Sequence, residues 1–197
     1  DPLDAVEKEY LRGRDSRARV TWGFAPTSPE YCTPDMLERL ADLSKQYDLP
    51  VYTHIYESKS MAVAGRFLMP EHDGSQIKYL KSTGLIGPRL SLAHSVWMLP
   101  EEIEIIAETG TNVVCNPVGN LKTKSGVPPI REYLEAGINV GIGCDNSSCS
   151  DAQNMFQAMK MFASLTAVSH VEPGPPLATD VIRSATISGA QTAGLDG

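Results

Sequence analysis

Four short apolar segments of the sequence each end at a side chain that could bind a metal ion, form a directed hydrogen bond or move a proton. His54 closes one segment, and Glu57 follows it by three residues. His94 closes the next segment, Asn116 closes the third, and Asp145 follows the fourth. Two imidazoles and two carboxylates make a nitrogen and oxygen donor set that suits a divalent metal ion. The first hypothesis is therefore a metal site built from the ends of these segments.

Each of these residues also has an ordinary structural explanation when it is taken alone. A single histidine near a strand end is more often a hydrogen-bonded structural residue than a ligand. Asp145 is placed to cap a following helix, and Glu57 would be stable as a carboxylate in a first helical turn. The joint pattern is harder to obtain by chance, because it repeats at the same point of successive segments. His72 and His170 lack this placement, and we interpret both as structural or surface residues.

The apolar segments alternate with helical patterns along the chain. Strands are predicted over residues 19–24, 50–56, 89–94, 112–116 and 138–144. Helices are predicted over about residues 1–15, from Thr33 and Pro34 onward through Leu43, and over 59–68, 76–82, 100–109, 129–136, 152–168 and 178–189. Thr33 before Pro34 is a typical helix start, and Gly110 is a typical helix stop.

Five strands that are each followed by helix predict an α/β fold with a parallel sheet buried on both faces. The spacing of the units suits a TIM (β/α)₈ barrel, but eight units typically take about 250 residues and five cannot close a barrel. The sheet is therefore either open and doubly wound or the carboxyl-terminal part of a barrel. In both folds the carboxyl ends of the strands face the ligand, so the four polar side chains are expected to converge there.

The composition excludes several classes of protein. The chain has 197 residues, enough for one domain, and its net charge of -7 argues against a nucleic-acid-binding surface. Its apolar runs are all too short to span a bilayer. The four cysteines form no CxxC pair, which favours reduced thiols and a cytoplasmic protein. Cys144 precedes Asp145, and we expect a small buried thiol there and not a nucleophile.

Other chemical motifs fail on their spacing. The glycine-rich segment Gly137–Gly143 contains no GxGxxG, and the sequence contains no P-loop. Zinc deaminases of the cytidine type need HxE and PCxxC. Here His54 and Glu57 form HxxE, and Cys144 and Cys149 lie five residues apart.

Several stretches match, in order and spacing, the motifs of one enzyme superfamily. They are Thr53–Glu57, Leu92–Ser95, Leu99–Ile103, Val114–Asn120, Gly126–Ile130, Gly141–Asn146 and Ala185–Leu195. In these motifs the chain resembles the amidohydrolase superfamily, and specifically its branch of aminohydrolases and chlorohydrolases, from about Val20 to Gly197. That resemblance implies a partial TIM barrel of about five carboxyl-terminal βα units. Residues 1–197 would then be one catalytic domain truncated at both ends, without the first barrel strands and the flanking β-sandwich.

The resemblance also implies a role for each strand-end residue. His54 and Asp145 would be metal ligands, and Asp145 would also accept a proton from the water that the metal activates. Glu57 would protonate a ring nitrogen of the substrate. His94 would hydrogen-bond the attacking hydroxide or the developing oxyanion.

The implied cofactor is a divalent metal ion, either zinc or Fe²⁺. The family's His-x-His pair of ligands is missing, since no two histidines here are separated by one residue, and we expect that pair upstream of Asp1. Asn116 and Asn120 are expected to bind the substrate. The expected partners are a small heterocyclic substrate and further copies of the full-length chain in a homo-oligomer, with no nucleic acid and no membrane.

The function implied is hydrolytic deamination of an amino-substituted nitrogen heterocycle of the purine, pyrimidine or triazine type. Three departures prevent the substrate from being carried over. Cys144 and Asn146 replace the commoner threonine and glycine around Asp145. Gly119 replaces the usual serine before Asn120, and Phe24–Ser28 stands where many relatives place a histidine after proline. A chlorohydrolase, a cyclic amidase or an inactive truncated homologue remain alternatives. The chain alone is expected to be inactive, because two ligands cannot hold a metal as four can.

Overall fold

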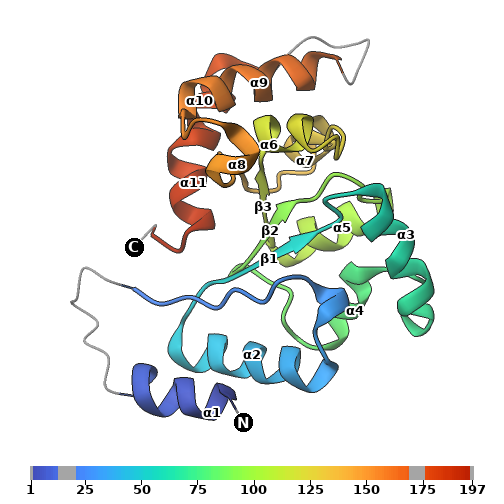
Figure 1. The fold of residues 1–197 in the computed structure, drawn as a ribbon, viewed down its shortest axis with the longest axis vertical. Coiled ribbons are helices and arrows are strands. Elements are labelled where there is room, and N and C mark those ends of the chain that lie inside the picture. Colours follow the sequence, from blue (N-terminus) through green and yellow to red (C-terminus); the bar gives the residue numbers. More distant parts are fainter. Residues whose placement is uncertain (1, 13–20, 169–175, 196–197) are drawn as a thin grey trace.

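The computed structural model describes residues 2–12, 21–168 and 176–195, and it alternates strands with helices as the sequence predicts (Figure 1). The four strands are β1 Val51–Ile55, β2 Leu90–His94, β3 Asn112–Cys115 and β4 Val140–Ile142. The helices are α1 Pro2–Val6, α2 Pro34–Tyr47, α3 Lys59–Leu68, α4 Gln76–Ser82, α5 Pro100–Thr109, α6 Pro117–Lys122, α7 Ile130–Glu135, α8 Ser147–Ser150, α9 Met155–Val168, α10 Ala178–Ala185 and α11 Ile187–Thr192. A π-helical turn, Glu7–Leu11, follows α1, and 3₁₀ turns occupy Pro29–Tyr31 and Pro70–His72.

The strands form one parallel sheet in the order β1-β2-β3-β4. Each strand therefore pairs with the next one along the chain, and helices make the crossovers, which confirms the predicted βα alternation. The register places His54 beside Ala93 and Ile55 beside His94. The carboxyl ends of β1 and β2 are thus level with each other.

The predicted strand over residues 19–24 is wrong for the part that the structure describes. Phe24 makes only an isolated parallel bridge to Val51, while residues 19 and 20 lie outside the described ranges. The Phe24 amide donates to the Pro50 carbonyl, and the Tyr52 amide donates to the Phe24 carbonyl. Pro26 has no N–H with which to continue such a ladder, so the regular pairing is interrupted there. The His54 amide then donates to the Thr27 carbonyl at 3.1 Å.

Two helix predictions also need correction, and one short helix was not predicted. The unpredicted helix is α6, which forms after Asn116 because Pro117 is well placed at a first helical position. The long helix predicted from residue 152 begins at Met155, after the short α8. The helix predicted over 178–189 is two helices, because the backbone of Thr186 leaves the helical region at φ −129° and ψ −88°.

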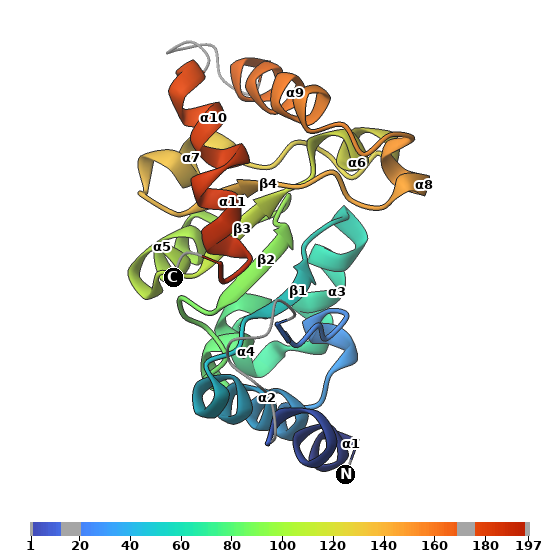
Figure 2. The same ribbon diagram turned by 90° about the vertical axis from the view of Figure 1, so that its left-hand side faces the viewer.

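The apolar core packs against one face of the sheet. The register puts Ile55, Leu92 and Val113 on that same face, and all three are fully buried. Tyr133 on α7 and Phe162 on α9 are fully buried in the same core. The helix α11 lies along β3 and β4 near their amino ends (Figure 2). In the described ranges, no helix is long and apolar enough to cross a membrane.

Candidate active site

The carboxyl ends of β1 and β2 bring three of the predicted residues together. The His54 and His94 rings stack with their centroids 5.5 Å apart and their planes inclined by 23°. Nε2 of His94 lies 3.9 Å from Oε2 of Glu57. The register of the two strands explains this gathering, because it sets His94 directly beside the residue that follows His54.

His54 is exposed, and one of its ring nitrogens has a fixed partner. Nδ1 lies 2.6 Å from the backbone carbonyl oxygen of Thr27. A carbonyl can only accept, so Nδ1 carries the hydrogen, which leaves a lone pair on Nε2 in the neutral form of the ring. Histidines that bind metals are commonly held in this way by a carbonyl on the other ring nitrogen. His54 therefore fits the role of a metal ligand through Nε2.

His94 is buried, with only 2% of its surface exposed, and it contacts a side chain from the next unit. Its Nδ1 lies 2.8 Å from Oδ1 of Asn120, which is fully buried on α6. Asn120 Nδ2 has no hydrogen-bond partner among the described residues. Asn120 thus supports the His94 ring, and its predicted contact with substrate stays a prediction.

Asn116 is also buried, and it precedes α6. Its side-chain oxygen lies so close to Gly143 that a Cβ on that glycine would come within 2.2 Å of it. A glycine before Asp145 is therefore required for Asn116 to lie where it does. The predicted role of Asn116 in substrate binding stays a prediction.

Asp145 lies at the same end of the sheet, beyond β4, and its carboxylate meets α6. Oδ1 accepts a hydrogen bond of 2.7 Å from the backbone amide of Asn146. A Cβ on Gly119 would lie 2.6 Å from Oδ2. The carboxylate therefore lies against the residue next to Asn120, which itself contacts His94.

The donors among the described residues do not by themselves complete a metal site. Across the described ranges, no group of three or more His, Cys, Asp and Glu side chains is placed to hold a metal ion. Zinc sites in proteins usually have three or four protein ligands. His54 and Asp145 therefore suit two positions of a ligand set that needs further donors.

The backbone at this edge of the sheet is strained. Tyr56, His94, Ser95 and Asp145 have φ values of 48°, 70°, 49° and 60°. Non-glycine residues seldom adopt this left-handed conformation, and such residues cluster at functional sites. The strained residues thus lie at the carboxyl ends of β1, β2 and β4, where the candidate site residues also lie.

Two supporting features of the site were not predicted from the sequence. One is the Thr27 carbonyl, which no side-chain motif could reveal. The other is a buried hydrogen-bond network between Tyr56 and Glu102, at the start of α5. Burial, together with the negative charge of Glu102, raises the pKa of Tyr56 well above its usual range, so its hydroxyl remains a donor. The Glu at the third position of a helix was the available signal for this network.

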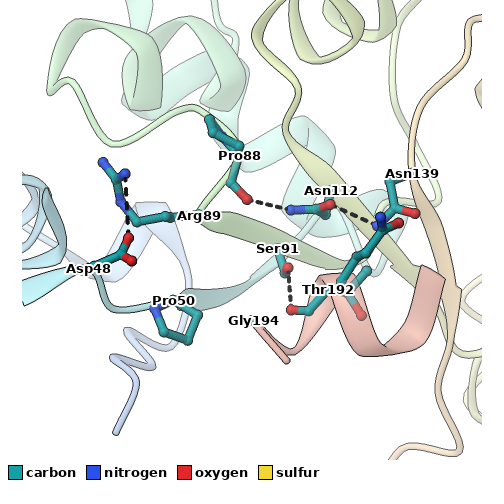
Figure 3. A pocket seen from close by; sticks show the side chains of 10 residues that line it. Asp48, Pro50, Pro88, Arg89, Ser91, Asn112, Asn139, Thr192 and Gly194 are labelled. Atoms are coloured by element: carbon teal, nitrogen blue, oxygen red, sulfur yellow. Dashed lines mark hydrogen bonds and ion pairs between the residues drawn. The ribbon is translucent and has the colours of Figure 1, made fainter. Parts of the chain in front are cut away.

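A cavity of about 420 Å³ lies at the opposite, amino end of the sheet (Figure 3). Ser91, Asn112 and Asn139 face it, but their polar groups are satisfied within the protein. Ser91 donates to the Thr192 carbonyl, Asn112 donates to the Pro88 carbonyl, and Asn139 donates to Asn112. In barrel folds the amino end serves stability and not catalysis. We therefore assign the candidate active site to the carboxyl end.

Three of the four thiols do not fit a nucleophilic site. Cys32, Cys115, Cys144 and Cys149 are all unpaired, as predicted. Burial raises the pKa of Cys32 and of Cys144, and it raises that of Cys115 to about 12. A reactive cysteine needs a lowered pKa, so these three thiols are unsuited to nucleophilic catalysis.

Comparison with known proteins identifies the family. The profile of the amidohydrolase family matches residues 3–197. The chain is 35% identical to the 5'-deoxyadenosine deaminase of Methanothermobacter thermautotrophicus over 97% of its own length and 44% of that protein. It thus spans less than half the length of this curated relative.

Solved structures agree with this result. An adenosine deaminase from Xanthomonas campestris with bound zinc superposes with a TM-score of 0.90 at 26% identity, over 98% of this chain and 43% of that one. An atrazine chlorohydrolase from Arthrobacter aurescens TC1, in complex with zinc, superposes with a TM-score of 0.83 at 27% identity, over 96% of this chain and 41% of that one. The prediction of a partial amidohydrolase barrel is confirmed. The chain belongs to the amidohydrolase family.

Proposed function

We propose that the complete protein is a metal-dependent hydrolase that deaminates an amino-substituted nitrogen heterocycle of the purine, pyrimidine or triazine type. The observation that carries this proposal is the gathering of His54, Glu57 and His94 at the carboxyl end of a parallel sheet. The similarity to a 5'-deoxyadenosine deaminase supports deamination of a purine ring as the first reaction to test.

The metal would be held in part by His54 and Asp145. Zinc is the first candidate, since two similar structures contain it, and Fe²⁺ is the alternative. The remaining ligands would be the His-x-His pair predicted outside this chain. A divalent metal would lower the pKa of bound water from 15.7 toward about 7, so that hydroxide forms at neutral pH.

The chain's own residues would then move the protons. The Asp145 carboxylate would accept the proton of the attacking water. Glu57 would deliver a proton to the ring nitrogen, so that the electrons of the attacked C=N bond have an acceptor. Nε2 of His94, which lies 3.9 Å from Glu57, would hydrogen-bond the attacking oxygen. Asn120 would keep the buried His94 ring in place, and ammonia would leave from the tetrahedral carbon.

The decisive test is Glu57→Gln in the complete protein. The amide keeps the shape of the side chain but cannot deliver the proton, so kcat for ammonia release should fall by several orders of magnitude while bound metal is retained. Glu104→Gln, an exposed change of the same kind on α5, is the matched control and should leave kcat unchanged. A near-normal rate for Glu57→Gln would rule out its role as the acid.

A chlorohydrolase is the second candidate, and the similarity to the atrazine chlorohydrolase favours it. Both reactions use an activated water, and they differ in the group that leaves. Assaying the complete protein with amino- and chloro-substituted heterocycles for ammonia and for chloride separates the two. A cyclic amidase would instead open a ring and release neither product.

The wider setting of the chain is part of the same proposal. Residues 1–197 would form the carboxyl-terminal part of the catalytic barrel domain in a cytoplasmic homo-oligomer. An inactive homologue is the outcome if metal analysis of the complete protein finds no bound metal.

A further inference from the structure

We propose that Tyr56 and Glu102 form a buried clamp that positions Glu57 relative to His94 at the edge of the candidate active site. Neither residue would touch the substrate, so both are positioning residues. The inference rests on the proposed function of Glu57, and it adds two residues to that function.

The backbone of Tyr56 ties the ends of β1 and β2 together. Its carbonyl oxygen accepts hydrogen bonds from the amides of Val96 at 3.1 Å and Trp97 at 3.3 Å. One residue earlier, the Ile55 carbonyl accepts from the amide of Ser95 at 3.0 Å. The segment that follows His94 is therefore bonded to the residue that precedes Glu57.

This tie holds the backbone in an unfavourable conformation. Tyr56, His94 and Ser95 all have positive φ, although none of them is a glycine. Such a conformation persists only where surrounding contacts determine it. Contacts in addition to these backbone hydrogen bonds are therefore expected to hold Tyr56 in this conformation.

The side chain of Tyr56 supplies that restraint. Its hydroxyl donates to Oε1 of Glu102 at 2.5 Å and accepts from the Gln76 amide at 2.8 Å. Glu102 is 1% exposed, and it also accepts from the Ser75 hydroxyl at 2.5 Å and from the Leu99 amide at 2.9 Å. A buried carboxylate with three donors makes short, directional bonds.

The network joins three elements at one point. Ser75 and Gln76 belong to the start of α4, Leu99 and Glu102 to the start of α5, and Tyr56 to the end of β1. Capping of α5 needs only the bond from the Leu99 amide to Glu102. The additional bond from Tyr56 therefore points to a function beyond helix capping, which is to fix the residue next to Glu57.

The test uses Tyr56→Phe and Glu102→Gln in the complete protein. Each variant is measured for kcat and KM of ammonia release, and for hydrogen exchange at the amides of Val96 and Trp97. A displaced catalytic group costs roughly up to 10²-fold in rate, so we expect kcat to fall about 10- to 100-fold with little change in KM. Exchange at Val96 and Trp97 should become faster, while exchange at Val113 in the sheet interior should not change.

The matched control is Tyr79→Phe. Tyr79 is buried, and its hydroxyl donates to the Cys32 carbonyl at 2.9 Å, away from the strand ends. This variant should lose stability as Tyr56→Phe does, but keep its kcat and its exchange rates at Val96 and Trp97.

The outcomes separate the clamp from the proposed function. If Tyr56→Phe lowers stability alone, with kcat and exchange as in Tyr79→Phe, the clamp is wrong. If Glu57→Gln stays active while exchange at Val96 and Trp97 still rises in Tyr56→Phe, then the clamp exists but Glu57 is not the acid. If Glu102→Gln does not fold, Tyr56→Phe alone decides.

Discussion

At the scale of the residue, Gly119 determines how closely α6 approaches Asp145. Any side chain at this position would place its Cβ 2.6 Å from Oδ2 of Asp145. The contact involves the far end of a side chain, so Asp145 can rotate away without disturbing the core. Glycine at position 119 therefore lets the helix and the carboxylate approach each other closely.

We predict that Gly119→Ala displaces the Asp145 carboxylate and weakens metal binding. Alanine favours a helix over glycine by up to about 1 kcal/mol, so the variant should fold as well as the parent. The measurement is zinc bound per chain of the complete protein after dialysis, together with urea unfolding. Gly189→Ala on α11, where a Cβ meets nothing closer than 3.5 Å, is the control and should retain its zinc. Full zinc retention in Gly119→Ala would argue against Asp145 as a ligand.

The sequence predicted the residues of the candidate site but not the groups that hold them in place. His54, Glu57, His94 and Asp145 could be found because parallel strands present their carboxyl ends at one edge. The Thr27 carbonyl could not be found, since every residue has one and only the fold selects it. The positive φ angles of Tyr56 and Ser95 could not be predicted from the sequence either. Positive φ is usually predicted from a glycine, and neither position is a glycine.

At the scale of the element, α1 and its following turn are attached to α2 through two carboxylates. Arg39 lies 3.3 Å from Oδ1 of Asp4, and the shorter bonds go to Glu7. Tyr47 donates to Oε1 of Glu7 at 2.8 Å, and Arg39 lies 2.7 Å from Oε2. The bond from Tyr47 lowers the pKa of Glu7, and Arg12 and Arg39 lower it further against the opposing effect of burial. A lowered folded-state pKa means that this stabilisation is present above the unfolded-state pKa and is lost as pH falls through the folded-state pKa.

We therefore predict that Tyr47→Phe destabilises the protein at neutral pH but not in acid. Urea unfolding at about pH 7 should show a lower midpoint for the variant, and the difference should shrink in acid as the pH falls through the lowered pKa of Glu7 and its carboxylate becomes protonated. Tyr31→Phe, at an exposed site, is the control and should match the parent at both pH values. A difference that persists in acid would mean that Tyr47 acts by packing alone.

Three helices were predicted with the bounds that the structure shows, whereas the first strand and the last helix were predicted incorrectly. The predicted bounds of α3, α4 and α5 match the structure, and Gly110 ends α5 with a left-handed φ of 69°. The expected strand before Pro26 failed because strand length depends on a partner and not on apolar content alone. The break at Thr186 could not be read, because Ala178–Gly189 has an unbroken helical pattern and the turn depends on packing against β4.

At the scale of the whole molecule, the candidate site and the packing of the last helix lie at opposite ends of the sheet. The carboxyl end carries the candidate site, while α11 closes against β3 and β4 near the amino end. Gly141 allows this approach, since a Cβ there would lie 3.0 Å from Oγ1 of Thr192. Tyr52 and Ser91 add hydrogen bonds to the carbonyls of Ala193 and Thr192.

We predict that Gly141→Val lowers stability without changing the chemistry. Overpacking of a tight contact typically costs about 1–3 kcal/mol, and Gly141→Ala should cost less than valine because it adds fewer atoms. The measurements are the urea midpoint and, for the folded complete protein, kcat and bound zinc. A loss of zinc in proportion to the loss of stability would mean that the two ends are coupled.

The left-handed residues at the strand ends bear on how this protein would respond to laboratory evolution. Glycine adopts positive φ without cost, so replacing Ser95 by glycine would relieve local tension in the folded chain. The same replacement would make the backbone next to His94 more flexible, and so loosen the placement of His94 relative to Glu57. Selection for thermal stability alone should therefore enrich glycine variants that are more stable but turn over more slowly. A screen that also requires turnover should retain the non-glycine residues at positive φ.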